Sequence, residues 1–362
     1  MSGENDDRKK PLPTRLVALI GILIFEVVAC ALLLSGSFLQ LGSLELVWLL
    51  VAVVSGMILF LFVAAWKLIR NRFQFSLASF LIATLVLGAG FGSLISFLQK
   101  SSKQREAAPR LTSLGAAVLW ENQGHPGLKE YLGRQYFEDV VSVYSLSPLQ
   151  MTDEDFALLK ELPGLRDLSL YQTSISDGHL QHLAKLEHLQ FLMICGANVK
   201  GPGIKSLANL PILTELHISA SPLNNAAAQA LSQCTQLTTL GVSGTQIGND
   251  DLIHFQRLPH LRELYLNATA ITDDGLKHLE EMPQLRFLGL VQTAITDTGL
   301  THLEKLEKLE NLNLSGTQIT DAGLVHLESL KHLNNLGLQN TKVTDAGIAR
   351  LQHKLPSCEI AR

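Results

Sequence analysis

The sequence predicts an α/β solenoid of nine 24-residue units, with a parallel inner sheet and outer helices, preceded by three transmembrane helices. Two observations lead to this prediction. The stretch LENLNLSGTQITDAGLVHLESLKH, residues 309–332, repeats the preceding 24 residues with Leu, Ile, Thr, Asp and His at the same offsets. In addition, three long apolar runs precede residue 100. A fixed period of this size is typical of solenoids, and runs of about 20 apolar residues can cross a bilayer as helices.

The apolar runs are residues 16–34, 46–66 and 75–98. The first run follows a basic tail, residues 1–15, and could be a signal peptide, but two further runs follow it so closely that we expect a retained span. Glu26 is the one charged residue in the three runs. The other two runs offer it no partner charge, so a carboxyl group facing the neighbouring helices is favoured over a transport role.

The distribution of basic residues predicts the orientation in the membrane. Four Lys and Arg residues lie in the tail, none in the first loop, three in the second loop and four after the third run. An orientation with the N-terminus inside places seven of them on the cytoplasmic side and four outside, which the positive-inside rule favours. The repeats would then lie outside the cytoplasm, although the four basic residues after the third run count against this orientation.

The repeats run without insertion from Val141 to Pro356 and follow the pattern LxxLxLxxTxITDxGLxxLxxL. The alternating LxLxL stretch predicts a short strand with one buried face, and Leu at spacings of three predicts a helical segment. Successive strands should stack in parallel, about 4.8 Å apart, with right-handed connections. We therefore assign the solenoid to residues 141–362.

Both ends of a solenoid need a cap, because the last apolar layer would otherwise face water. Residues 99–140 supply the linker and the N-terminal cap. Within them, residues 103–114 predict a helix, residues 116–120 a strand and residues 127–137 a short amphipathic helix. Residues 357–360 predict a partial tenth strand at the other end.

The pattern resembles leucine-rich repeats, closest to the cysteine-containing subclass whose signature includes ITDxGL. Where that family has Asn or Cys, this chain has Thr in six units, as at Thr173 and Thr245. A threonine hydroxyl can still bond to the backbone of the adjacent turn. The runs RNRFQFSLASFLIATLVLGAG and VTDAGIARLQHKLPSCEIAR are similar to bacterial membrane-anchored proteins of this repeat class. The resemblance implies a protein of the bacterial inner membrane, and gives architecture more than activity.

Composition excludes several functions. Residues 1–110 carry 11 Lys and Arg against 6 Asp and Glu, and the remainder carries 18 against 27, so the repeats are acidic and unsuited to nucleic acid. The four cysteines are widely spaced and form no CxxC pair, so they indicate neither a zinc site nor a disulfide framework. No phosphate-loop, zinc-protease, nucleophile-elbow or kinase motif occurs. We expect no enzymatic activity and no cofactor.

Two kinds of polar residue recur in register. The aspartates of the TDxG motif precede the helical segments, where they could cap the helix amides; they include Asp273, Asp297, Asp321 and Asp345. A calcium role is the alternative, but the EF-hand spacing is absent. The histidines form two columns, yet residues one unit apart do not converge on one metal ion as zinc requires. A repeated helix-side residue is the favoured interpretation.

The exposed strand positions vary while the framework repeats, as expected of a binding surface on a fixed scaffold. They and the residues just before the strands contain aromatic, Met and Arg types that are enriched at interfaces; these are Phe191, Met193, His217, Arg262, Tyr265, Arg286 and Phe287. Gly241 and Gly289 flank Tyr265 and predict a notch beside its ring. The alternative is a solvated sheet face with incidental aromatics.

The sequence therefore favours a non-enzymatic, membrane-anchored module that binds a protein or a cell-envelope ligand through the concave face. One alternative is a sensor or scaffold that acts through its transmembrane helices on another membrane protein. The other is an enzyme with an unrecognised site in the cap or spans.

Overall fold

The computed structural model describes residues 96, 100–122, 138–145 and 147–362. The chain divides into two compact units, Met1–Ser96 and Phe97–Arg362, and the fold described below belongs to the second. Apart from residue 96, the three predicted spans and residues 127–137 of the predicted cap lie outside the described residues. Within the described ranges, no helix combines the length and apolar character needed to cross a membrane.

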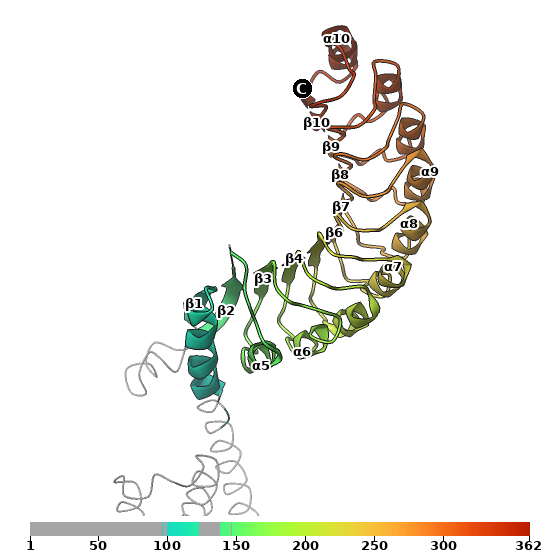
Figure 1. Ribbon diagram of the computed structural model, residues 1–362. Helices are drawn as coiled ribbons and strands as arrows, with labels where there is room; N and C mark the ends of the chain where they lie inside the picture. Colours follow the sequence, from blue (N-terminus) through green and yellow to red (C-terminus); the bar gives the residue numbers. More distant parts are fainter. Residues whose placement is uncertain (1–95, 97–99, 123–137, 146) are drawn as a thin grey trace, which may run out of the picture. The chain divides into compact units, whose positions relative to one another are not determined.

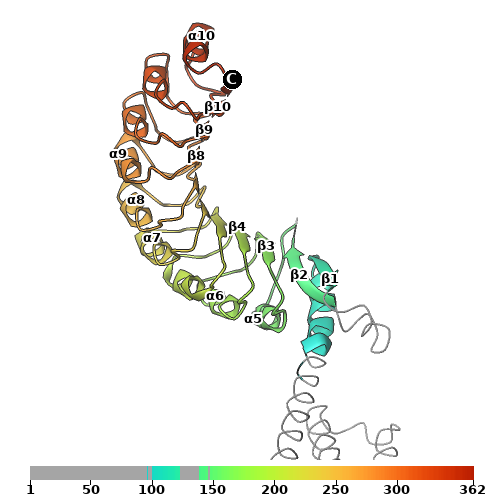
Figure 2. The same ribbon diagram turned by 180° about the vertical axis from the view of Figure 1, so that it is seen from behind.

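One sheet of eleven strands, hydrogen-bonded in sequence order, lines the inner side of the curved solenoid (Figures 1 and 2). Strands β2 to β11 pair in parallel, and β1 pairs antiparallel with β2. The strands are β1 (Ala117–Asn122), β2 (Glu138–Tyr144), β3 (Asp167–Tyr171), β4 (Phe191–Cys195), β5 (Glu215–Ser219), β6 (Thr239–Gly241), β7 (Glu263–Tyr265), β8 (Phe287–Gly289), β9 (Asn311–Asn313), β10 (Asn335–Gly337) and β11 (Glu359–Ala361). From β3 to β11 the register advances by 24 residues per strand, as the period predicts. Between β2 and β3 the step is 25 residues, since Ser142 pairs with Asp167, so the predicted register is wrong by one residue in the first unit.

Short helical segments form the outer side of the curve (Figure 1). They are α5 (Asp153–Leu158), η2 (Leu159–Glu161), α6 (Leu180–Leu183), η3 (Pro202–Asn209), α7 (Asn225–Leu231), η4 (Asn249–Asp251), α8 (Leu252–Phe255), α9 (Asp273–Leu276), η5 (Lys277–Glu281), η6 (Gly299–Leu303), η7 (Gly323–Leu327) and α10 (Asp345–Lys354), where η marks a 3₁₀ helix. Helices about 10 Å wide cannot stack as closely as strands about 4.8 Å apart, so the solenoid curves with its sheet inside.

Leucine columns fill the space between the sheet and the helices. Leu240, Leu264 and Leu288 occupy the same position in successive strands and are 0% exposed. The apolar core is one continuous cluster from Ala107 to Cys358. Because each strand position has its counterpart in the neighbouring unit, each unit buries its apolar face against the next.

The ninth-position threonines bond to the backbone of their own turn, as expected. The Thr245 hydroxyl donates to the Val242 carbonyl oxygen at 2.6 Å, and the equivalent hydroxyls donate in the same way; these belong to Thr269, Thr293, Thr317 and Thr341. Thr173 is the exception, since its buried hydroxyl has no partner among the described residues. The residue just before this position has a positive φ angle, between 45° and 71°, in every unit from that of Gln172 to that of Asn340.

The TDxG aspartates contact the following unit, not the amides of their own helices as the sequence suggested. Asp273 accepts from the Thr296 amide at 2.8 Å and from its hydroxyl at 2.6 Å. Asp297 and Asp321 repeat this arrangement one and two units later, and Asp345 pairs with Arg362. None of these four aspartates takes the N-cap position of its own helix. Thr272 and Thr344 cap α9 and α10, and Asp297 and Asp321 lie just before the N-cap residues of η6 and η7. In Asp273, Asp297 and Asp321 the carboxylate therefore bonds to the next unit.

At the N-terminal end, residues 100–113 are helical and lie beside β1 and β2 (Figure 1). Gln104 donates to Asp139 and accepts from the Val140 amide, both at 3.0 Å. The apolar side of this helix, including Ala107 and Leu111, joins the core. At the other end, β11 is the partial tenth strand expected from residues 357–360.

Two of the helix-side histidines pair with carboxylates of the preceding unit. His302 Nδ1 lies 2.5 Å from Glu280, and His326 Nδ1 lies 2.6 Å from Glu304. Lys305 also contacts Glu280, and Lys305 and His302 together lower the pKa of that carboxyl group. In the part of the chain that the structure describes, no three His, Cys, Asp or Glu side chains are grouped as metal ligands.

Candidate functional site: an aromatic row on the concave sheet

Four rings from different units form a continuous row across the concave sheet. Phe191 on β4, His217 on β5, Tyr265 on β7 and Phe287 on β8 follow one another, with ring centroids separated by 5.9, 5.5 and 4.3 Å in that order. Each ring is half-buried. We call these four residues the aromatic row. Met193 also lies on this face, in register between Ser169 and His217.

Gly241 makes the row continuous. It pairs in register with His217 on one side and with Tyr265 on the other, so two strand spacings separate those rings. A Cβ atom at Gly241 would lie 2.2 Å from His217 Nδ1, which shows that the imidazole lies over the glycine. Any larger residue would force the His217 ring away from Tyr265.

The prediction of a notch beside Tyr265 is therefore wrong. His217 fills the space over Gly241. On the other side, a Cβ atom at Gly289 would meet Asn267 Oδ1 at 2.9 Å and Phe287 Cε1 at 3.3 Å. The two glycines do leave room, but neighbouring side chains of the same face occupy it. The surface beside Tyr265 is a ridge of packed rings.

The aromatic row is uncharged at neutral pH. Burial lowers the pKa of His217, although the Glu263 carboxylate opposes this shift. Burial also raises the pKa of Tyr265 to about 12, and the nearby carboxylates of Glu263 and Glu215 add to the increase. The Tyr265 hydroxyl donates to Glu263 Oε2 at 3.1 Å, so that carboxylate fixes the direction of the phenol.

The two arginines of the predicted face lie at its rim. Arg262 and Arg286 each immediately precede a strand, and both are exposed. Arg286 forms an ion pair with Glu310 at 2.6 Å. Among the described residues, none forms an ion pair with Arg262. The structure thus brings together the aromatic residues that the sequence indicated, but sets both cations apart from the rings.

Comparisons with known proteins agree with this architecture. A family model described as a leucine-rich repeat matches residues 257–279 and 305–327. A search of curated proteins found no match.

Similar solved structures include two internalins of Listeria monocytogenes. The first, encoded by inlF, is 22% identical, with 57% of this chain and 69% of that chain covered and a TM-score of 0.42. Internalin C2 is 26% identical, with 58% and 84% covered and a TM-score of 0.44. A leucine-rich repeat protein of Leptospira interrogans is 20% identical, with 57% and 62% covered and a TM-score of 0.35. The family model matches two stretches of the repeats, and strands β3 to β11 share a 24-residue register over one pattern of buried leucines. This chain is therefore a leucine-rich repeat protein.

Proposed function

We propose that the protein is a non-enzymatic binding module that captures a partner protein on the aromatic row. The leucine-rich repeat fold is typical of protein-binding modules. The observation that carries the proposal is the unbroken contact of the four rings over five strands. Half-buried, mutually packed rings lose little conformational freedom on binding, and aromatic residues are frequent among the anchors of protein interfaces.

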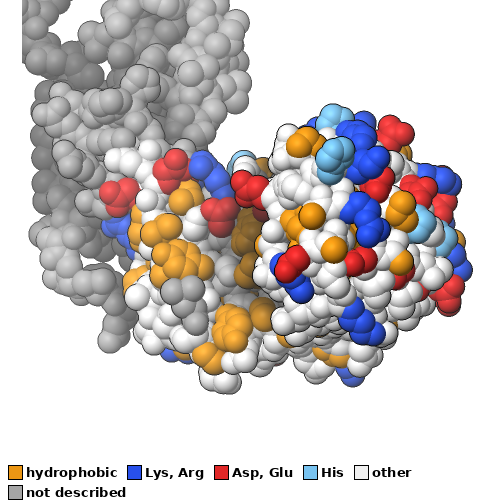
Figure 3. All heavy atoms as spheres, turned by 90° about the horizontal axis from the view of Figure 1, so that it is seen from above, with side chains coloured by type: hydrophobic (Ala, Val, Ile, Leu, Met, Phe, Trp, Pro, Cys, Tyr) orange, Lys and Arg blue, Asp and Glu red, His pale blue; other side chains and the backbone are white. Residues whose placement is uncertain are grey.

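The chemistry of the row favours a partner segment with apolar side chains. The rings offer a neutral apolar surface, and Glu263 beside them accepts hydrogen bonds. An acidic segment fits less well, because Arg286 already forms an ion pair with Glu310 and the Glu263 carboxylate lies beside the rings. Figure 3 shows Lys, Arg, Asp and Glu side chains interspersed over the C-terminal end of the solenoid.

Replacing Tyr265 and Phe287 together with alanine should abolish capture of the partner. This change removes two adjacent rings of the row and leaves the buried leucines in place, so thermal unfolding should change little. The measurement is affinity capture of the full-length protein from membranes, followed by mass spectrometry, for the parent and the double variant.

The matched control is Ile253→Ala with Val325→Ala, which removes two exposed apolar side chains from the helix side. This control should retain the partners of the parent. If the Tyr265 and Phe287 variant also retains them, the partner binds the cap, the helix side or the apolar segments. The concave-face proposal would then have to be abandoned.

We further propose that residues 16–34, 46–66 and 75–98 anchor the protein in a bacterial inner membrane, with the solenoid outside the cytoplasm. The basis is the apolar length of the segments and the distribution of basic residues. A membrane-impermeant thiol reagent applied to intact cells should label a cysteine placed at Val325, and should miss one placed in residues 1–15. Labelling of the tail alone would place the solenoid in the cytoplasm.

A further inference from the structure

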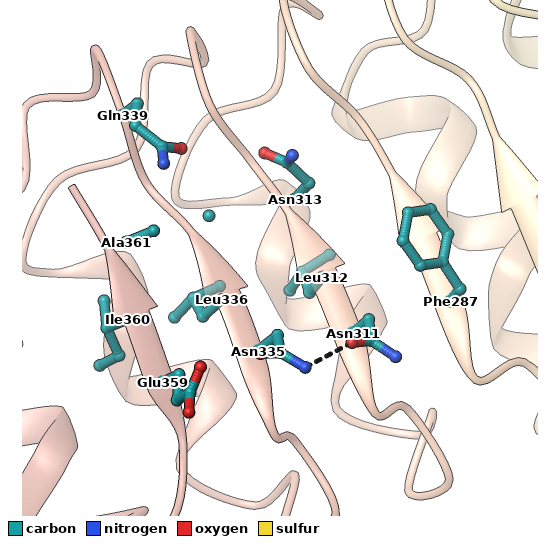
Figure 4. Close-up of a pocket in the computed structure, with 11 residues that line it drawn as sticks. Phe287, Asn311, Leu312, Asn313, Asn335, Leu336, Gln339, Glu359, Ile360 and Ala361 are labelled. Atoms are coloured by element: carbon teal, nitrogen blue, oxygen red, sulfur yellow. Dashed lines mark hydrogen bonds between the residues drawn. The ribbon is translucent and has the colours of Figure 1, made fainter.

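A second feature of the concave face is a hollow of about 370 Å³ in front of β9, β10 and β11 (Figure 4). Gly337 and Ala361 are among its lining residues. A Cβ atom at Gly337 would lie 2.5 Å from Asn313 Oδ1, which shows that the Asn313 carboxamide lies over this glycine. Phe287 stands at one end and Ile360 at the other. The volume is within the range of small-molecule sites, about 300–1,000 Å³.

Carboxamides dominate the lining of the hollow. Asn311 and Asn335 lie on one side, and Asn313 and Gln339 lie on the other (Figure 4). Glu359 is the one charged side chain among the described residues that line it. Without a cation in the lining, the hollow offers nothing to balance a phosphate or carboxylate. The lining therefore disfavours an anionic ligand.

The carboxamides bond to one another and keep unused capacity. Asn335 Nδ2 donates to Asn311 Oδ1 at 2.7 Å, which leaves the Asn311 amide protons and the Asn335 oxygen available. Asn313 Oδ1 accepts from the Ser315 amide and hydroxyl, so its own amide protons are also available. Each carboxamide carries two donors and an acceptor with two lone pairs. The hollow therefore presents donors and acceptors side by side, held in place by their own hydrogen bonds.

We propose that this hollow binds a neutral saccharide. Sugar hydroxyls both donate and accept at close spacing, which matches neighbouring carboxamides and the Glu359 carboxylate. The apolar face of a sugar ring can pack against the Phe287 ring at the end of the hollow. A peptide is matched less well, because the buried Leu312 and Leu336 between the two amide pairs leave no apolar recess for its side chains. This site does not depend on the partner protein proposed above, although Phe287 borders both.

The test uses the full-length protein, purified in a detergent without a sugar headgroup. The probe is an array of neutral oligosaccharides of glucose, galactose, mannose and N-acetylglucosamine, and the strongest glycan is then titrated by calorimetry. Asn311→Ala with Asn335→Ala should weaken that affinity about tenfold or more, since several hydrogen bonds are lost. Asn334→Ala, an exposed neighbour outside the hollow, is the matched control and should stay within about twofold.

His217→Ala with Tyr265→Ala separates this site from the aromatic row, because neither side chain lines the hollow. This variant should lose the partner protein and still bind the glycan as the parent does. The proposal is overturned if no neutral glycan on the array binds. It is also overturned if the Asn311 and Asn335 variant binds glycans as the parent does, or if that variant loses peptides from a parallel peptide array instead.

Discussion

Replacing Leu264 with alanine should lower the free energy of unfolding by about 2–5 kcal/mol. Leu264 is 0% exposed and lies between Leu240 and Leu288 in the central strands of the sheet. The cost has two parts, the lost burial of the leucine methyl groups and the cavity left in the column. In a repeat protein each unit is stabilised mainly by its neighbours, so a weak central unit should also separate the unfolding of the two halves. Denaturant unfolding followed by circular dichroism measures both effects.

Val325→Ala provides the comparison for this prediction. Val325 has the same aliphatic character but is 56% exposed on η7. Its truncation should change the free energy of unfolding by less than about 0.5 kcal/mol. Equal losses for the Leu264 and Val325 variants would mean that the leucine columns do not hold the units together.

Replacing Gly203 with alanine should cost about 1–3 kcal/mol or more, because no side chain can move aside to receive the new methyl group. A Cβ atom at Gly203 would lie 2.2 Å from the Asp177 carbonyl oxygen and 2.6 Å from the Asp177 Cα atom. The Gly203 amide also donates to Asp177 Oδ1 at 2.8 Å, so the clash would open the contact between two units. Thermal unfolding of the variant measures the loss.

Gly178→Ala is the matched glycine. A Cβ atom there would have only the Ser176 hydroxyl within reach, at 4.0 Å, so stability should stay within about 0.5 kcal/mol of the parent. A Gly203 variant as stable as the Gly178 variant would show that neighbouring units can slide apart locally without loss. The tight aspartate–glycine contact would then have no part in holding the repeat together.

The period of the sequence predicted the fold well because it reports burial directly. From β3 onward each alternating stretch became a strand in the expected register, since alternation leaves only one choice of buried face. The first unit, β2, is offset by one residue from the predicted register. The left-handed position after each strand was not visible, because Gln172, Ala220 and Gly244 all occupy it. Only the stacking of the turns imposes that conformation. The aspartate contacts were not predicted for a related reason. They join residues 23 positions apart in the sequence, which belong to successive units and not to one helix.

The sequence predicted which residues form the candidate site, but not how their rings are arranged. Alternation placed Phe191, His217, Tyr265 and Phe287 on the exposed face of the sheet. The position of the His217 ring over Gly241 depends on packing between side chains of different units, which a single unit does not encode. The asparagines of the hollow were visible at strand positions. A carboxamide at such a position does not by itself distinguish a binding surface from a solvated sheet face.

Site-specific photo-crosslinking tests most directly whether the aromatic row is the binding surface. A photoreactive phenylalanine analogue placed at position 265 in the full-length protein would replace one ring of the row with another. The same analogue at Val325 places the reactive group on the helix side. Our account predicts a crosslinked partner from position 265 and none from position 325 after irradiation of intact cells. Adducts from position 325 alone would contradict the assignment of the concave face.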